Sequence, residues 1–269
     1  MNKDIKFYTN QNKEAWDEVM PMHQAASKEK LDLLFSNPSY IYQNDEQLLE
    51  ILKEVNVKGK DVIQLCCNNG TELLSLKNMG ANRCVGVDIS VVAITEAQER
   101  ATRHGIDCQF ICSDVYDIPE EYFNSFDIAY FTAGSIGWLP DINKVFEIVF
   151  NLLKEKGKVL IHEIHPFSEM LPFDNNDLEN RLQIIEPYFR SKAIVENGSL
   201  DYVGGTEYVA KTQYWFVHTI SSLIMALVNN GLKINFFAEY PKDISAGHKK
   251  IEELKEGVPL SYILLGEKF

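Results

Sequence analysis

Apolar stretches alternate with amphipathic stretches through the middle of the chain. Short apolar runs rich in β-branched residues predict strands at residues 61–67, 83–89, 108–112, 126–133 and 158–165. Apolar positions spaced for a helix predict helices between them, at residues 71–78, 91–104 and 141–156. Strands that are apolar along most of their length and separated by helices indicate a parallel sheet covered on both faces. The pattern therefore predicts an α/β fold, a doubly wound three-layer sandwich.

Both ends of the chain depart from this alternation. Residues 12–30 predict a helix that Pro21 should kink or divide, and Asp45 is placed to cap a second helix. Residues 166–214 lose the alternation and predict an inserted cap over the strand ends. A helix at about 221–230 and strands at 232–239 and 260–266 follow, and the strands predict a closing antiparallel hairpin.

The domain organisation follows from these segments. We expect an N-terminal helical lid segment at residues 1–58 and one domain at residues 59–269. The inserted cap, at about residues 166–214, belongs to that second domain.

Composition and charge narrow the range of partners. The 269 residues include 26 basic and 39 acidic side chains, a formal net charge of −13. Such a chain repels phosphate backbones, so no nucleic-acid partner is expected. No apolar run is long enough for a membrane span, and the first residues lack an apolar signal core, which predicts a cytoplasmic location.

Cysteine and histidine spacing gives no metal or disulfide pattern. The cysteines are odd in number and lie in or beside predicted strands, so a disulfide framework is not expected. His162 and His165 are three residues apart on a strand, which places them on opposite faces. We therefore predict no metal site.

The turn after the first predicted strand is the most informative stretch, VIQLCCNNGTELL at residues 62–74. A pyrophosphate-binding turn has three glycines, but here Cys66 and Asn68 stand at the first two and only Gly70 remains. Asn68 tolerates left-handed backbone angles, and helix N–H groups can hold a carboxylate. The turn thus disfavours a dinucleotide and permits a nucleoside ligand without phosphates.

Two acids at later strand ends support a nucleoside ligand. Asp88 closes the second predicted strand, where a carboxylate can accept hydrogen bonds from both ribose hydroxyls. Asp114 follows the third strand, where an acid can receive an adenine amino group. All these sites fall at carboxyl ends of strands, where doubly wound sheets bind ligands.

On these motifs the sequence resembles the class I S-adenosylmethionine-dependent methyltransferases, of the small-molecule type, over essentially the whole chain. The resemblance implies a Rossmann-like, seven-stranded, mostly parallel sheet with an antiparallel C-terminal strand, and S-adenosylmethionine as cofactor. Gln64 stands where the family has the acid that helps orient the methionine amino group. The implied cofactor-binding residues are Trp16, Gln64, Cys66, Cys67, Asn68, Gly70, Asp88, Ile89, Asp114, Val115 and Thr132.

Substrate contacts are expected near the loop after the fourth strand and the lid. Gly134 lies in the loop that the resemblance turns toward the substrate, and His23 is at an aromatic lid position. Trp138 either walls the pocket or seats the following helix. His165 ends the fifth strand and is our candidate general base or substrate contact, with loop anchoring as the alternative.

The sequence therefore predicts methyl transfer from S-adenosylmethionine to a small molecule. Two alternatives stay open: a non-catalytic S-adenosylmethionine-binding protein, motivated by the lost glycines, and a methyltransferase acting on protein or RNA. Neither the acceptor atom nor the oligomeric state follows from the residues.

Overall fold

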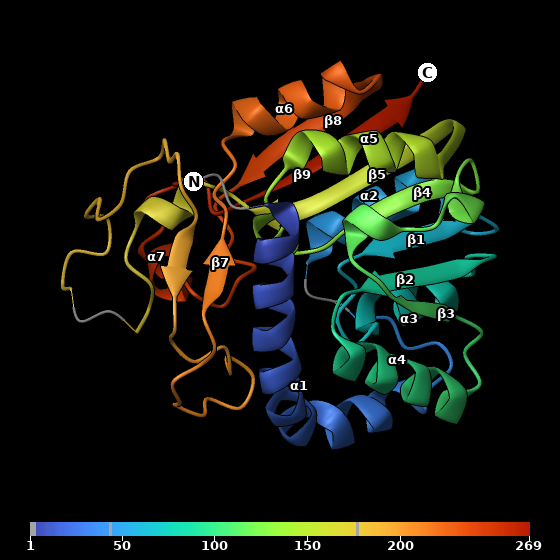
Figure 1. The fold of residues 1–269 in the computed structure, drawn as a ribbon, viewed down its shortest axis with the longest axis horizontal. Helices are drawn as coiled ribbons and strands as arrows, with labels where there is room; N and C mark the ends of the chain where they lie inside the picture. Colours follow the sequence, from blue (N-terminus) through green and yellow to red (C-terminus); the bar gives the residue numbers. More distant parts are fainter. Residues whose placement is uncertain (1–3, 43–44, 176–177) are drawn as a thin grey trace.

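The computed structural model describes residues 4–42, 45–175 and 178–269 of the protein. Its centre is a seven-stranded sheet with the strand order β3-β2-β1-β4-β5-β9-β8 (Figure 1). The strands are β1 (Val62–Leu65), β2 (Cys84–Asp88), β3 (Gln109–Cys112), β4 (Phe126–Phe131), β5 (Leu153–Ile164), β8 (Leu232–Tyr240) and β9 (Ser261–Lys268). The first five run parallel, and β9 is antiparallel to both of its neighbours, β5 and β8. The predicted fold class is confirmed.

Helices cover both faces of the sheet. The helices of the described residues are α1 (Ile5–Phe35), α2 (Glu46–Val55), α3 (Thr71–Asn78), α4 (Val91–His104), α5 (Ile142–Leu152), α6 (Ile220–Asn229) and α7 (Lys249–Leu254). Short 3-10 turns lie at η1 (Val115–Asp117), η2 (Glu120–Tyr122), η3 (Ile136–Trp138) and η4 (Ser168–Met170). Two apolar clusters form the core, one on each face: α5 and α6 contribute to the first, and α2, α3 and α4 to the second.

Several predicted boundaries agree with the structure because their signals are local. Gly70 and Gly105 lie at the ends of α3 and α4 with left-handed backbone angles. Asp45 caps α2, since its side chain accepts hydrogen bonds from the N–H groups of Gln47 and Leu48. Among the described residues, no helix is both long and apolar enough to cross a membrane.

Other boundaries differ from the prediction. Helix α5 ends at Leu152, and β5 begins at Leu153, where the prediction continued the helix to residue 156. Leu153 is fully buried and pairs with Phe126 of β4, so a contact between strands overrides the local helical pattern. Helix α7 was not predicted; its buried Ile251 packs with Leu171 and Leu260 in a small separate cluster.

The N-terminal helix is longer than predicted and connects two parts of the molecule. It continues through Pro21 without division, although it changes direction along its length (Figure 1). The Asn12 side chain exchanges two hydrogen bonds with the backbone of Tyr214, at 2.7 and 2.9 Å. Asp17 accepts a hydrogen bond of 2.7 Å from the Ser90 hydroxyl at the start of α4. Helix α1 therefore joins the inserted segment to the sheet domain.

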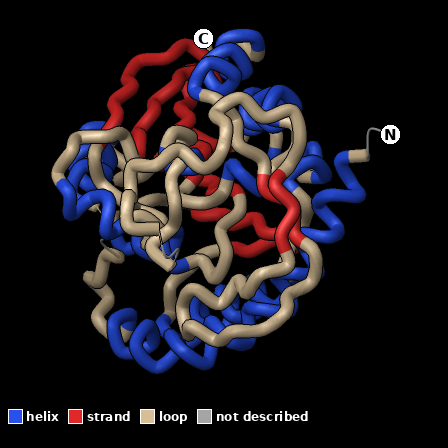
Figure 2. Tube along the Cα trace, turned by 90° about the vertical axis from the view of Figure 1, so that its left-hand side faces the viewer, coloured by secondary structure: helices blue, strands red, loops and turns tan. Residues whose placement is uncertain are grey.

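The inserted segment at residues 166–214 is mostly loop. Its regular part is one antiparallel pair among the described residues, β6 (Ile194–Glu196) with β7 (Gln213–Trp215). Figure 1 shows this pair and its loops on the far side of α1 from most of the sheet, and Figure 2 shows the loops from that side.

Candidate functional site

The turn between β1 and α3 adopts a conformation that normally requires glycine. Cys66, Asn68 and Gly70 have φ angles of 55°, 48° and 74°, all in the left-handed region. The three positions at which a glycine-rich turn carries glycine thus keep that backbone geometry, although two of them carry side chains. Asparagine tolerates this region, whereas cysteine adopts it at a cost of about 1–2 kcal/mol. The turn therefore has left-handed backbone angles at all three positions, although only one of them is a glycine.

A side chain at Gly70 would disturb the packing of β3 and α4 against the turn. A Cβ atom there would lie 2.6 Å from the Phe110 ring and 3.1 Å from Ala97. We expect Gly70→Ala to lower the free energy of unfolding by about 2–4 kcal/mol, from left-handed strain and overpacking together. Gly134→Ala is the matched control, because Gly134 has a φ of +78° but nothing within 4 Å of its Cβ position. In denaturant titration, Gly134→Ala should lower the free energy of unfolding by about 1–2 kcal/mol. Equal losses for Gly70→Ala and Gly134→Ala would contradict the packing argument.

Asp88 ties the turn to the end of β2. Its carboxylate accepts hydrogen bonds from the N–H groups of Asn68, at 2.8 Å, and Ser90, at 2.9 Å. Burial raises the pKa of Asp88, and these hydrogen bonds oppose that rise. Asp114, one strand further on, accepts hydrogen bonds from Lys6, at 2.8 Å, and from the N–H group of Tyr116, at 3.1 Å.

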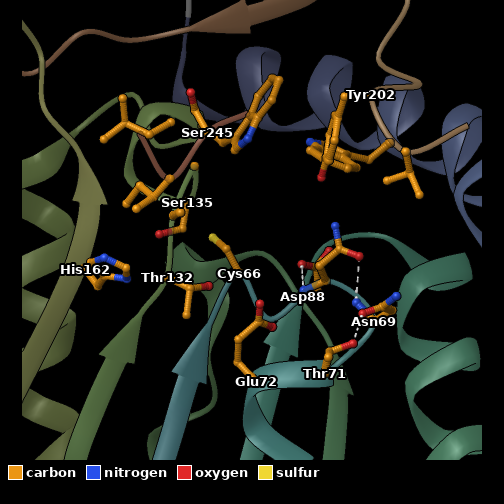
Figure 3. A pocket seen from close by; sticks show the side chains of 18 of the residues that line it. Cys66, Asn69, Thr71, Glu72, Asp88, Thr132, Ser135, His162, Tyr202 and Ser245 are labelled. Atoms are coloured by element: carbon orange, nitrogen blue, oxygen red, sulfur yellow. Dashed lines mark hydrogen bonds between the residues drawn. The ribbon is translucent and has the colours of Figure 1, made fainter. Parts of the chain in front are cut away.

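One cavity of about 1020 Å³ lies at this edge of the sheet. Its walls come from α1, the inserted segment, the start of α2 and the loops after β1, β2, β3 and β4. Figure 3 shows Cys66, Asp88 and Thr132 on the sheet side and Tyr202 across from them. Most of the predicted site residues line this cavity: Trp16, His23, Cys66, Asn68, Asp88, Ile89, Asp114, Val115, Thr132, Gly134 and Trp138.

The other predicted residues lie outside the lining of the cavity. Cys67 is buried behind the turn, and Gly70 packs on Phe110. Gln64 is fully buried below Thr132, to whose hydroxyl its amide donates a hydrogen bond of 3.2 Å. His165 is also buried, and its Nε2 lies 2.8 Å from Glu239 on β8, an arrangement that fits the anchoring alternative.

Sequence reasoning missed the residue that shapes the loop after β4. The buried Glu163 carboxylate accepts hydrogen bonds from the N–H groups of Ser135, at 2.8 Å, and Ile136, at 2.9 Å, and also from the N–H group of Gly134. Burial raises the pKa of Glu163, while these hydrogen bonds lower it. A carboxylate from β5 therefore holds the loop that borders the cavity.

Three tryptophans form an aromatic wall of the cavity that begins at the end of this loop. The rings of Trp16 and Trp138 meet edge to face at 5.4 Å, and those of Trp138 and Trp215 at 4.9 Å. A Cβ atom on Gly137 would lie 2.3 Å from the Trp215 ring, so that glycine makes room for the indole. The aromatic wall thus joins α1, η3 and β7, three segments far apart in the sequence.

His162 was also missed as a site residue, because the sequence suggested for it only a possible metal-ligand pair with His165. It is 3% exposed, lines the cavity, and lies beside Thr132 in Figure 3. Its Nε2 is 3.3 Å from the carboxylate of Asp45, the residue that caps α2. Burial alone would raise the pKa of Asp45, but His162, the Gln47 N–H group and Lys242 lower it. An ionised carboxylate therefore faces this imidazole.

Glu169 makes the stability of the protein depend on pH. Burial raises its pKa from 4.5 to about 7, with Glu163 and Glu196 adding to the rise and Arg190 opposing it. The folded state then binds a proton that the unfolded state has released, so stability falls as pH rises from 4.5 to about 7. We expect wild type to lose about 2–3 kcal/mol relative to Glu169→Gln over this range, measured by denaturant titration. A constant difference between the two proteins would contradict the raised pKa.

Comparison with known proteins decides the family. A sequence model described as a methyltransferase domain matches residues 56–197, more than half of the chain. The chain belongs to the class I S-adenosylmethionine-dependent methyltransferases. The matched region contains the turn after β1, Asp88, Asp114 and the loop after β4.

Individual curated relatives match a smaller part of this chain than the family model does. A ribosomal protein L11 methyltransferase of Aliivibrio salmonicida is 32% identical over 94 residues, which is 35% of this chain and 32% of the relative. The matches span about a third of the length of the first curated relatives.

Solved structures share the fold of this chain. A structure described as a putative S-adenosylmethionine-dependent methyltransferase from Listeria monocytogenes has a TM-score of 0.61 at 18% identity, covering 82% of this chain and 97% of the other. Geranyl diphosphate C-methyltransferase from Streptomyces coelicolor, solved with geranyl diphosphate and S-adenosyl-L-homocysteine, has a TM-score of 0.58 at 12% identity. That match covers 83% of this chain and 78% of the other.

The site fits the family's cofactor, S-adenosylmethionine, which carries an adenine, a ribose and an amino acid. Asp88 and Asp114 offer carboxylates to the cavity at the ends of β2 and β3. Gln64 Oε1 is a buried acceptor with no hydrogen-bond partner among the described residues. An orphaned acceptor beside the turn is what an amino-acid group with N–H donors would satisfy.

Proposed function

We propose that the protein transfers a methyl group from S-adenosylmethionine to a small molecule held in the cavity. The observation that carries this proposal is that cofactor-type residues and lid residues line the same cavity. Ligand pockets for drug-sized molecules span about 300–1,000 Å³, so a cavity of about 1020 Å³ has room for the cofactor and a small acceptor. The N-terminal lid segment at residues 1–58, which contains α1 and α2, and the inserted cap at about 166–214 act together as the lid.

The residues of the chain bind the cofactor, orient the acceptor and exclude water. Asp88 accepts hydrogen bonds from the ribose, and Asp114 from the adenine. Bound S-adenosylmethionine supplies an electrophilic methyl group. The loop at Gly134, fixed by Glu163, positions the acceptor, and the tryptophan wall keeps water out.

His162 takes the acceptor's proton in this proposal, in place of the predicted His165. It lies in the cavity wall, whereas His165 does not. The carboxylate of Asp45, 3.3 Å from its Nε2, orients the ring and stabilises the imidazolium. Loss of His162 should then lower kcat more than it changes the affinity for cofactor.

A protein acceptor is the second candidate, because the matched L11 methyltransferase and a putative protein N5-glutamine methyltransferase of Methanocaldococcus jannaschii are named for protein substrates. A third is a non-catalytic S-adenosylmethionine-binding protein, motivated by Cys66 and Asn68 at the glycine positions. An RNA acceptor is disfavoured by the net charge of −13.

Transfer of a labelled methyl group separates these candidates. The purified protein is incubated with methyl-labelled S-adenosylmethionine and either the small-molecule fraction or the macromolecular fraction of a cell extract. We expect label in the small-molecule fraction only, and none with heat-inactivated protein. Label in protein would favour the second candidate, and cofactor binding without transfer to either fraction would favour the third.

A further inference from the structure

Gln64 leaves the family's cofactor site without one of its charges. The family places an acid there to orient the amino group of the methionine part, but an amide carries no charge to neutralise an ammonium. We propose that Glu72, on the first turn of α3, supplies the carboxylate that Gln64 lacks and binds this ammonium group. The inference rests on the proposed function and names the residue that selects the amino-acid end of the cofactor.

The contacts bring Glu72 to the position from which the acid is missing. The Gln64 amide donates a hydrogen bond of 3.2 Å to the Thr132 hydroxyl, and Gln64 lies close enough to Glu72 to lower the pKa of its carboxyl group. The three residues come from α3, β1 and the end of β4, and Glu72 and Thr132 both line the cavity. Figure 3 shows the Glu72 carboxylate directed toward the cavity, close to Cys66 and Thr132.

The charge on Glu72 is not paired with a lysine or arginine in the part of the chain that the structure describes. Asp114, in contrast, pairs with Lys6. The Glu72 side chain is half-buried and lines the cavity. This burial raises the pKa of Glu72, although the nearby Gln64 and His162 lower it. A buried carboxylate without a cation is costly, and a bound ammonium would remove that cost.

A second, independent feature indicates a ligand with N–H donors at this point. Gln64 Oε1 is fully buried and has no hydrogen-bond partner among the described residues. Buried acceptors are normally satisfied, so an orphan beside a cavity marks the place of a donor. An ammonium group in the cavity has three donors and can reach Glu72 directly, because Glu72 lines the cavity and Gln64 is buried beneath it. The carboxylate at position 72 thus takes the place of the acid that position 64 lacks.

Two ligands that differ only at the amino-acid end test the inference by titration calorimetry. S-adenosylhomocysteine has this end, and 5′-methylthioadenosine has the same adenosine and a thioether without it. We expect Glu72→Gln to bind S-adenosylhomocysteine roughly ten- to a hundredfold more weakly than wild type, as for loss of a charge-assisted hydrogen bond. Its affinity for 5′-methylthioadenosine should be unchanged, which also shows that the variant is folded.

Exchanging the two side chains provides the rescue. The double variant Gln64→Glu with Glu72→Gln restores a carboxylate at the family's position and should recover most of the affinity for S-adenosylhomocysteine. The inference is overturned if Glu72→Gln binds S-adenosylhomocysteine as wild type does, or loses both ligands equally. Failure of the exchange to restore affinity would equally overturn it. Failure of wild type to bind either ligand would instead contradict the proposed function, and this inference with it.

Discussion

Asp88→Ala is expected to weaken binding of S-adenosylhomocysteine by at least about a hundredfold, because two hydrogen bonds to a charged acceptor contribute roughly 1.5–3 kcal/mol each. The same carboxylate accepts a hydrogen bond from the Asn68 N–H group in the turn after β1. Its loss therefore removes a ligand contact and also loosens the turn. Titration calorimetry measures the effect directly. Unchanged affinity would contradict the assignment of Asp88 to the ribose.

Two further variants separate these contributions. Asp88→Asn keeps one acceptor oxygen for Asn68 and should lose less affinity than the alanine variant. Asp107→Ala removes a carboxylate that is 98% exposed and far from the lining of the cavity, and should bind as wild type does. A loss of affinity in Asp107→Ala as large as in Asp88→Ala would indicate a general effect of charge instead of a local contact.

Glu163→Ala should have the largest effect on stability, a loss of about 3–5 kcal/mol in the free energy of unfolding. The substitution leaves the N–H groups of Gly134, Ser135 and Ile136 without their shared acceptor inside the protein. Loss of the loop should also weaken cofactor binding, since Gly134 and Ser135 line the cavity. Denaturant titration and calorimetry on the same sample report the two effects.

Glu155 offers a matched control on the same strand. It is exposed, so Glu155→Ala should change stability by no more than about 0.5 kcal/mol. Glu163→Gln keeps the shape of the side chain and one acceptor oxygen. Its loss of stability should therefore lie between those of Glu155→Ala and Glu163→Ala. If Glu163→Ala were as stable as Glu155→Ala, the loop would owe its conformation to something other than this carboxylate.

The parts of the fold that the sequence predicted are those with local signals. Alternating apolar runs located the strands of the parallel sheet, and the glycines at positions 70 and 105 marked where α3 begins and α4 ends. The start of β5 was misplaced because Leu153 is held by its partner Phe126, which the sequence around it does not reveal. Helix α7 was missed because it depends on Ile251 packing against distant residues.

The candidate site likewise contains residues that local signals predicted and residues whose roles depend on distant contacts. Residues at successive strand ends, such as Asp88 and Asp114, were predicted because topology alone brings them to one edge of the sheet. Glu163 and His162 act through partners distant in the sequence, at the loop after β4 and at Asp45. Their roles depend on packing between elements. Glu72 did carry a local signal, since it lies two residues after Gly70 on the first helical turn, but its contact with Gln64 emerged only from the structure.

The central claim is that this cavity binds S-adenosylmethionine although two motif glycines are missing. Titration calorimetry of the purified protein, cleared of co-purified ligand, with S-adenosylmethionine, S-adenosylhomocysteine and NAD tests it most directly. We predict binding of the first two ligands in the micromolar range and none of NAD, because the turn lacks the glycines that a pyrophosphate needs. Folded protein that binds neither S-adenosylmethionine nor S-adenosylhomocysteine would contradict the account.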